Sequence, residues 1–329
     1  MPKKPAHDHL LNTVAWRTYR ANHNWPNEAI ELPYYQDQVV FSRSMPLVGP
    51  INVIAAQEQK LKVKDIDDFT EQLKSNLNGA VAKCWFTQKF DERIAANLVK
   101  EGWVPCKHPV STVSELKIDL AQGAEALRAS LDKKTRYKLR KAEKAGIEVS
   151  MSSGDATDIE ELATLVEITK DRSSSGVRSM QQMREAWDLF KQHDQLRIWK
   201  ATHDGKVLNA IAVVMTQDTV WNRDSGSLRG FNKLNAPLYL RWKIAEHYAN
   251  EGKRKTYNLM GVSPKSHRDA GRPHTLDGVT KFKQSFNPHI SDSLGVFELP
   301  LDAKLYKRFK TLEPWILRYY FRIKKEYWY

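Results

Sequence analysis

The sequence contains few cysteines and no long apolar run. Cys84 and Cys106 are the two cysteines among 329 residues, and their spacing fits neither a disulfide framework nor a metal site. This usage is typical of a protein kept in a reducing compartment. The first residues, MPKKPAH, precede no apolar signal segment, and no later stretch approaches the length of a membrane span. We therefore expect a cytoplasmic protein without a membrane-spanning anchor.

The common catalytic signatures are also missing. We find no Gly-x-Ser-x-Gly elbow, no Walker loop, no His-Glu-x-x-His pair and no dinucleotide fingerprint. Small acetyltransferases carry a Gln/Arg-x-x-Gly-x-Gly/Ala loop whose amides cradle the coenzyme A pyrophosphate, and this sequence has none. The sequence therefore predicts neither a metal nor a bound cofactor, and it argues against coenzyme A as the donor.

The composition indicates a folded protein with a polyanionic partner. Hydrophobic residues make up 41% and charged residues 28% of the chain, which excludes wholesale disorder. A chain of 329 residues usually divides into two domains. The 52 basic residues exceed the 39 acidic ones by 13, and such an excess favours nucleic acid, nucleotide phosphates or an anionic membrane surface as partner.

Hydrophobic patterning predicts a mixed α/β protein. We expect strands at 39–41, 51–54, 80–86, 112–120, 196–202, 208–215, 219–223 and 256–260. We expect helices at 10–19, 66–77, 91–101 and 237–251. His203-Asp204-Gly205 predicts a tight hairpin turn.

An internal duplication is suggested by spacing. Ile94-Ala95 precedes Glu101-Gly102 as Ile244-Ala245 precedes Glu251-Gly252, although four matching residues also fit chance. The link between two halves would lie near 152–154.

The most basic segment is DKKTRYKLRKAEKAG, residues 132–146. Asp132 can cap a helix whose Leu139 and Ala142 face a core. Four cations then share one side of that helix: Lys133, Arg136, Arg140 and Lys144. This pattern indicates phosphate contact, and a solvated helix face is the alternative.

A second segment, Lys281-Phe282-Lys283 followed by Phe286, offers two aromatic anchors with lysines between them. Its alternative is that the aromatics are core and the lysines are solvated.

Six stretches in register resemble the Fem family of aminoacyl-tRNA-dependent peptidyltransferases, in the compact form without the helical arm. They are 11–16 (LNTVAW), 102–120 (ending in IDL), 134–149, 169–172 (TKDR), 236–242 (APLYLRW) and 278–286 (GVTKFKQSF). The sequence departs from the family at Asn12-Thr13, and at Tyr257 to Gly261, where an aspartate is usual.

The resemblance implies two tandem acetyltransferase-like (GNAT-like) domains of α/β (α+β) class, facing a cleft. The first would comprise residues 1–149 and 297–329, including a C-terminal helix that returns to it, and the second residues 150–296. The implied reaction moves an amino acid from aminoacyl-tRNA to the stem-peptide amine of a lipid-linked or nucleotide-linked peptidoglycan precursor. The alternatives are an acyl-CoA-dependent N-acyltransferase and a non-catalytic RNA-binding protein. We expect a monomer.

Within that resemblance, individual residues receive roles. Asp119, at the end of a strand, is the candidate base that takes a proton from the acceptor amine, although a structural aspartate is equally consistent. Lys283 is the candidate for contacting the tRNA 3′ end or the developing oxyanion. The candidates for binding the precursor are Arg43, Arg223, Tyr239, Tyr257 and Phe282. The four cations on one side of the basic helix are assigned to the acceptor stem.

The C-terminal stretch from Tyr306 to Tyr329 mixes cations with aromatic residues. Pro314 suits the first turn of a helix, so we expect the helix to run from Trp315. Packing on the first domain is one reading of this stretch. The other adds contact between its outer basic and aromatic side chains and the inner leaflet of the membrane.

Overall fold

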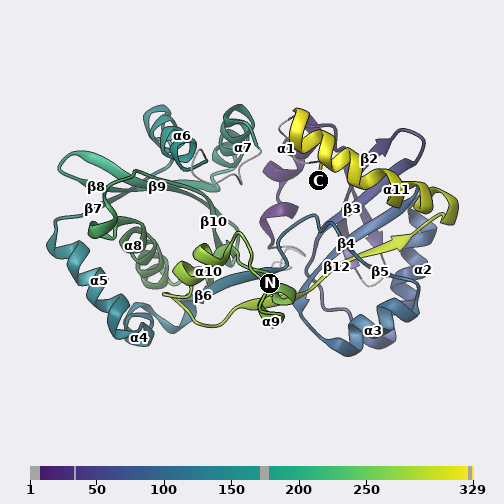
Figure 1. The fold of residues 1–329 in the computed structure, drawn as a ribbon, viewed down its shortest axis with the longest axis horizontal. Coiled ribbons are helices and arrows are strands. Elements are labelled where there is room, and N and C mark those ends of the chain that lie inside the picture. The colour runs from purple at the N-terminus through teal and green to yellow at the C-terminus, as the bar shows by residue number, and fades with distance from the viewer. Residues whose placement is uncertain (1–7, 33–34, 171–177, 325–327) are drawn as a thin grey trace. The chain divides into compact units, whose positions relative to one another are not determined.

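The computed structural model describes all residues except 1–7, 33–34, 171–177 and 325–327. The chain divides into two compact units, of which unit 1 comprises Met1–Ser114 and Asp292–Tyr329 and unit 2 comprises Glu115–Ser291. Each unit is a mixed sheet with helices packed on it (Figure 1). The predicted α/β class is confirmed.

Unit 1 is built on a sheet of order β1-β2-β3-β4-β12, with the short β5 paired to β12. Its strands are β1 (Asn27–Leu32), β2 (Tyr35–Met45), β3 (Gly49–Gln57), β4 (Val81–Lys89), β5 (Val104–Pro105) and β12 (Ser291–Pro300). Its helices are η1 (Leu10–Asn12), α1 (Val14–Asn22), η2 (Val63–Asp65), α2 (Ile66–Asn76), α3 (Glu92–Lys100), α11 (Ala303–Tyr319) and the π-helical η5 (Tyr320–Lys324).

Unit 2 is built on a sheet of order β6-β11-β10-β9-β8-β7. Its strands are β6 (Ser114–Asp119), β7 (Glu148–Ser152), β8 (Leu196–His203), β9 (Lys206–Met215), β10 (Thr219–Ser227) and β11 (Thr256–Gly261). Its helices are η3 (Leu120–Gln122), α4 (Ala124–Ser130), α5 (Lys133–Lys144), α6 (Ala156–Lys170), α7 (Met180–Gln192), η4 (Asn232–Leu234), α8 (Ala236–Glu251), α9 (Lys265–Asp269) and α10 (Asp277–Lys283).

Each of the two units contains the same kind of crossover connection between parallel strands. In unit 1, β2 and β3 are antiparallel, α2 follows, and β4 returns parallel to β3. In unit 2, β9 and β10 are antiparallel, α8 follows, and β11 returns parallel to β10. The tandem, acetyltransferase-like arrangement therefore holds for both units. The four matching residues noted in the sequence align α3 with α8. In the structure, the helix of unit 1 that corresponds to α8 is α2, so this alignment is wrong.

Two turns form as their residues predict. Asp204 and Gly205 have φ of 48° and 71°, the left-handed pair that a two-residue hairpin between β8 and β9 requires. Gly252, with φ of 69°, ends α8.

At Gly226 on β10, an added Cβ would lie 2.2 Å from the Leu165 backbone carbon, so this glycine lets α6 pack directly on the strand.

The boundary between the units differs from the predicted domains. The first unit ends at Ser114 rather than at residue 149, and the return begins at Asp292 rather than at 297. The cause is tertiary: β6 pairs with β11, and α5 packs on α8 with Leu139 and Ala142 in the core of unit 2. The polar stretch near 152–154 ends a strand of unit 2 and does not separate domains.

The C-terminal helix returns to unit 1, as predicted, but it starts earlier than Pro314 suggests. It begins at Ala303, where Asp302 Oδ1 accepts the Leu305 amide at 2.8 Å, and Pro314 lies inside it. Phe309 from this helix is completely buried with Val39 and Phe41. Across the described part of the chain, no helix combines the length and apolarity needed to cross a membrane.

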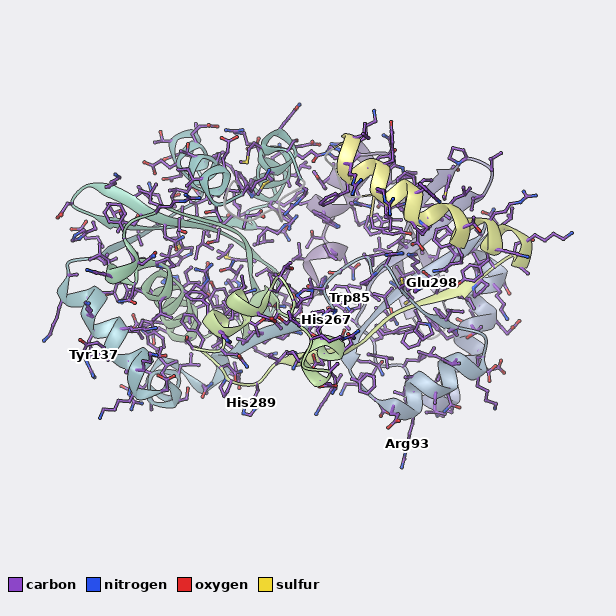
Figure 2. All side chains as sticks on the ribbon, in the orientation of Figure 1. Trp85, Arg93, Tyr137, His267, His289 and Glu298 are labelled. Atoms are coloured by element: carbon purple, nitrogen blue, oxygen red, sulfur yellow. The ribbon has the colours of Figure 1, made fainter. Side chains whose placement is uncertain are left out.

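A buried ion cluster ties that helix to the sheet of unit 1. Lys83 on β4 is fully buried, and its Nζ lies 3.2 Å from Glu298 on β12 and in contact with Glu313 on α11. Lys310 Nζ lies 2.9 Å from the second oxygen of Glu298, which Figure 2 labels. The Tyr329 hydroxyl donates to Glu313 at 2.5 Å. Two cations thus balance two carboxylates below α11.

This balance predicts a strong stability effect. Replacing Lys83 with Met leaves two buried carboxylates with less compensation, so the free energy of unfolding of unit 1 should fall by about 3–5 kcal/mol. Chemical denaturation measures the loss. The control is Lys310→Met, whose side chain is 30% exposed and should cost less. Equal losses for the two variants would contradict the central position of Lys83.

Candidate active site

Lys283 ends α10 with its amine turned into unit 2. The residue is 9% exposed, and its Nζ donates to the Gly261 carbonyl at the end of β11, 2.6 Å away. Ser263 fixes the start of α10 to this strand end, because its amide donates to Thr280 Oγ1 at 2.9 Å and its hydroxyl to Asp277 at 2.6 Å. The lysine is therefore held between a strand end and a short, anchored helix.

Arg241 on α8 lies beside this lysine. Its guanidinium carbon lies 5.1 Å from the centroid of Phe282, the residue before Lys283. The guanidinium donates to the Pro237 carbonyl and to Ser225 Oγ on β10, each at 3.0 Å. Arg241 is 8% exposed, and burial lowers its pKa below the ordinary value for arginine.

The surroundings change the proton affinity of Lys283. Burial first, and then the charge of Arg241, lower the pKa of its amine to about 7, while Glu115 acts in the opposite direction. Glu115 on β6 is buried, accepts from Asn258 Nδ2 at 3.0 Å and lies 3.3 Å from Lys117 Nζ. A lysine of this kind can exchange a proton near neutral pH, which a solvated lysine does rarely.

Asp119 does not belong to this group. In the β6–β11 ladder Asp119 pairs with Thr256, whereas Glu115 pairs with Gly261, the carbonyl that Lys283 contacts. Four strand residues separate the two positions, about 13 Å. Asp119 is exposed, and its carboxylate caps η3 by accepting the Ala121 amide at 3.0 Å. The structure thus gives Asp119 a capping contact apart from Lys283, and its assignment as the base stays a prediction.

The predicted precursor-binding residues of unit 2 divide between two places. Phe282 adjoins Lys283, and Tyr257 is fully buried with its hydroxyl on Asn222 Oδ1 at 3.1 Å. Tyr239 is buried on the side of α8 that faces α4 and α5, where Arg128 and Glu143 act on its hydroxyl. Residues two apart on a helix point to different sides, so Tyr239 cannot share the position of Arg241.

Arg223 lies at the β-bulge of β10, next to the buried Asp224. Burial would raise the pKa of Asp224, but the charges of Arg178 and Arg223 outweigh it and keep this pKa below its usual range. Asp224 also accepts from Arg178 at 3.0 Å and from Trp187 Nε1 at 2.9 Å. The charge of Arg223 therefore helps to stabilise a buried carboxylate that joins α7 to the sheet.

Arg43 belongs to unit 1 and contacts its C-terminal segment. The guanidinium carbon lies 3.8 Å from the Trp328 ring centroid, and Nη2 donates to the Tyr320 hydroxyl at 2.7 Å. The ring centroid of Trp25 lies 5.8 Å from the same guanidinium carbon. Such aromatic contacts anchor the returning chain, and the role of Arg43 in precursor binding stays a prediction.

The basic helix α5 presents three of its four assigned cations to solvent. Lys133, Arg140 and Lys144 are exposed, whereas Arg136 donates to the carbonyls of Ala129 and Leu131 at 2.8 and 2.7 Å. Arg136 therefore closes the end of α4. Tyr137 on the same helix is 61% exposed and is labelled at the outer edge of Figure 2. Of the segment 169–172, Asp171 and Arg172 lie outside the described residues.

The chain resembles known proteins in its fold and in one segment of its sequence. The structure is similar to that of FemX, with a TM-score of 0.76 and 14% identity over 92% of this chain and 94% of that one. It is also similar to a conserved protein of unknown function from Bacteroides thetaiotaomicron, with a TM-score of 0.55 and 12% identity over 90% and 92% of the chains. No curated protein sequence matches the chain. Residues 195–314 match the FemAB family.

Sequence reasoning missed Arg241 and Glu115. Both left a signal, since each is a charged residue inside an apolar pattern: Arg241 lies within APLYLRW and Glu115 within TVSELKIDL. Charged side chains are seldom buried without a partner, and an element that buries one usually does so for a reason. Only the strand register and the face of α8 show that both approach Lys283.

The exposed cations of α5 generate a prediction for RNA binding. The test variant changes three exposed residues to Gln: Lys133, Arg140 and Lys144. We expect weaker binding of tRNA and a slope of log affinity against log salt that is smaller by about 2–3, because each phosphate contact contributes about 0.7–0.9. Filter binding over a salt series measures the slope.

The matched control removes the same charge from unit 1, at the exposed Lys60, Lys62 and Lys64. Its slope should stay at the wild-type value. If the two triple variants behave alike, the α5 helix is a solvated face and carries no RNA contact.

Proposed function

We propose that the protein transfers an amino acid from aminoacyl-tRNA to the stem-peptide amine of a peptidoglycan precursor, forming part of an interpeptide bridge. The match of residues 195–314 to the FemAB family and the structural similarity to FemX support the reaction class. The observation that carries the proposal for this chain is the buried amine of Lys283, with a pKa of about 7, inside the matched region.

In this reaction the enzyme mainly has to position the two reactants and stabilise the charge that develops on them. An ester is already activated, so the protein has to align the acceptor amine, remove its proton and stabilise the oxyanion that forms on the carbonyl. Lys283, held by Gly261 and flanked by Phe282, is the residue we assign to the RNA 3′ end and the oxyanion. The exposed cations of α5 are assigned to the RNA phosphates.

The assignment predicts the effect of Lys283→Met. Transfer should fall at least about 100-fold, because loss of an oxyanion or 3′-end contact costs roughly 3 kcal/mol of transition-state stabilisation. The assay incubates the protein with charged tRNA and lipid-linked or nucleotide-linked precursor and weighs the product by mass spectrometry. Lys281→Met, at the exposed lysine of the same helix, is the control and should retain activity. Turnover above half of wild type in the Lys283 variant would refute the role.

We further propose that α11 and η5 contact an anionic membrane surface. Trp315, Tyr319, Phe321 and Ile323 are 66%, 47%, 47% and 67% exposed, and Arg318, Arg322 and Lys324 are exposed among them. Each cation near an anionic surface contributes about 1 kcal/mol, so three cations with four apolar side chains suit reversible binding.

This surface predicts salt-sensitive binding to vesicles. The protein should pellet with vesicles containing phosphatidylglycerol at low salt and remain in solution at high salt or with phosphatidylcholine alone. Changing Arg318, Arg322 and Lys324 to Gln should abolish pelleting, whereas the Lys60, Lys62 and Lys64 variant should behave as wild type. Failure of the wild type to pellet at low salt would overturn the membrane contact and favour a nucleotide-linked acceptor.

A further inference from the structure

Arg241 is a buried cation whose described partners are all neutral. Its two terminal nitrogens donate to the Pro237 carbonyl and to Ser225 Oγ, and its Nε is buried without a hydrogen-bond partner among the described residues. Tyr257 is the titratable group that acts on it electrostatically. Burying a guanidinium without a carboxylate is costly, so the position demands an explanation.

The second cation of this region is Lys283, and the charged groups facing it can be named. Arg241 faces it from α8 and Glu115 from β6. On its own helix, Asp277 is already engaged by the Ser263 hydroxyl and the His274 amide, and Lys281 is exposed. Glu115 is shared with Lys117 and Asn258. One shared carboxylate therefore opposes Lys283, and among the described residues Arg241 is acted on by the Tyr257 hydroxyl.

We propose that Arg241 is a positioning residue that holds Lys283 in its uncharged amine form, so that this amine can accept the proton of the acceptor ammonium. The inference rests on the proposed function and deepens it. The geometry supports it in two ways. The guanidinium is fixed by hydrogen bonds from two elements and by the Phe282 ring, and a fixed positive charge disfavours a second one nearby.

The proton transfer balances. A free lysine with a pKa of about 10.4 is neutral in roughly one molecule in a few thousand at pH 7, whereas the Lys283 amine, with a pKa of about 7, is neutral in about half. Lys283 takes one proton from the acceptor ammonium and later releases it to water. The freed nitrogen bonds to the ester carbonyl carbon, the carbon–oxygen bond to the RNA breaks, and a second proton passes from nitrogen to the departing 3′ oxygen. While protonated, Lys283 can stabilise the oxyanion.

The test uses the pH dependence of kcat/KM and the pH dependence of Lys283 acetylation. Acetic anhydride modifies the neutral amine, and mass spectrometry of the Lys283 peptide reports its pKa without any need for transfer activity. In Arg241→Gln, both the acidic limb of the rate profile and the labelling pKa should move up by about one pH unit. Arg241→Lys keeps the charge and should leave both near wild type.

Two further variants keep the proposal falsifiable if Arg241→Gln does not fold. Glu115→Gln removes the opposing charge, so the labelling pKa of Lys283 should move down. Ser225→Ala removes one hydrogen bond of Arg241 but not its charge, so the labelling pKa of Lys283 should stay at the wild-type value. A labelling pKa that stays unmoved in both Arg241→Gln and Glu115→Gln would overturn the inference. A shifted labelling pKa without any transfer by wild type would overturn the proposed function and leave the Arg241–Lys283 coupling standing.

Discussion

Compensation of buried charge is the constraint on which both units depend. In unit 1, Lys83 lies at the contact of two strands and α11, and the carboxylates of Glu298 and Glu313 surround it. This cluster holds the C-terminal helix to the sheet, because each member would be costly to bury alone. In unit 2, Glu115 opposes the charge of Lys283, whereas the described partners of Arg241 are neutral. Buried charges that are fully paired hold α11 to the sheet of unit 1. Buried cations that are incompletely paired lie at the candidate active site of unit 2.

The crossover of unit 2 explains how that site forms. The β10–α8–β11 unit places Arg241 on the side of α8 that reaches Ser225, while the end of β11 provides the Gly261 carbonyl. The chain then returns through α9 to α10, whose last residue is Lys283. Residues of α8, β11 and α10 thus lie around one amine. Gly261, the last residue of β11, pairs with Glu115 of β6, and its carbonyl accepts from the Lys283 amine.

Unit 1 uses its charged and aromatic residues differently. Arg43 is enclosed by Trp328, Tyr320 and Trp25, and Lys83 approaches the ring of Tyr329 at 4.2 Å. These contacts secure the end of the chain against the sheet. They leave the opposite side of α11 exposed, with Trp315 and Ile323 in solvent. A helix with one side fixed by buried charge and the other side basic and aromatic can meet an anionic surface without unfolding.

The sequence by itself determined the α/β class, most strands and helices and the hairpin at Asp204-Gly205, because these depend on local periodicity and turn chemistry. Only the tertiary structure decided where the boundary between the units lies and which residues surround Lys283. Strand register placed Asp119 and Glu115 at opposite ends of β6. Helix rotation turned Arg241 toward the lysine and Tyr239 away from it. Register and rotation are set by contacts between distant segments, and a local pattern in the sequence does not encode them.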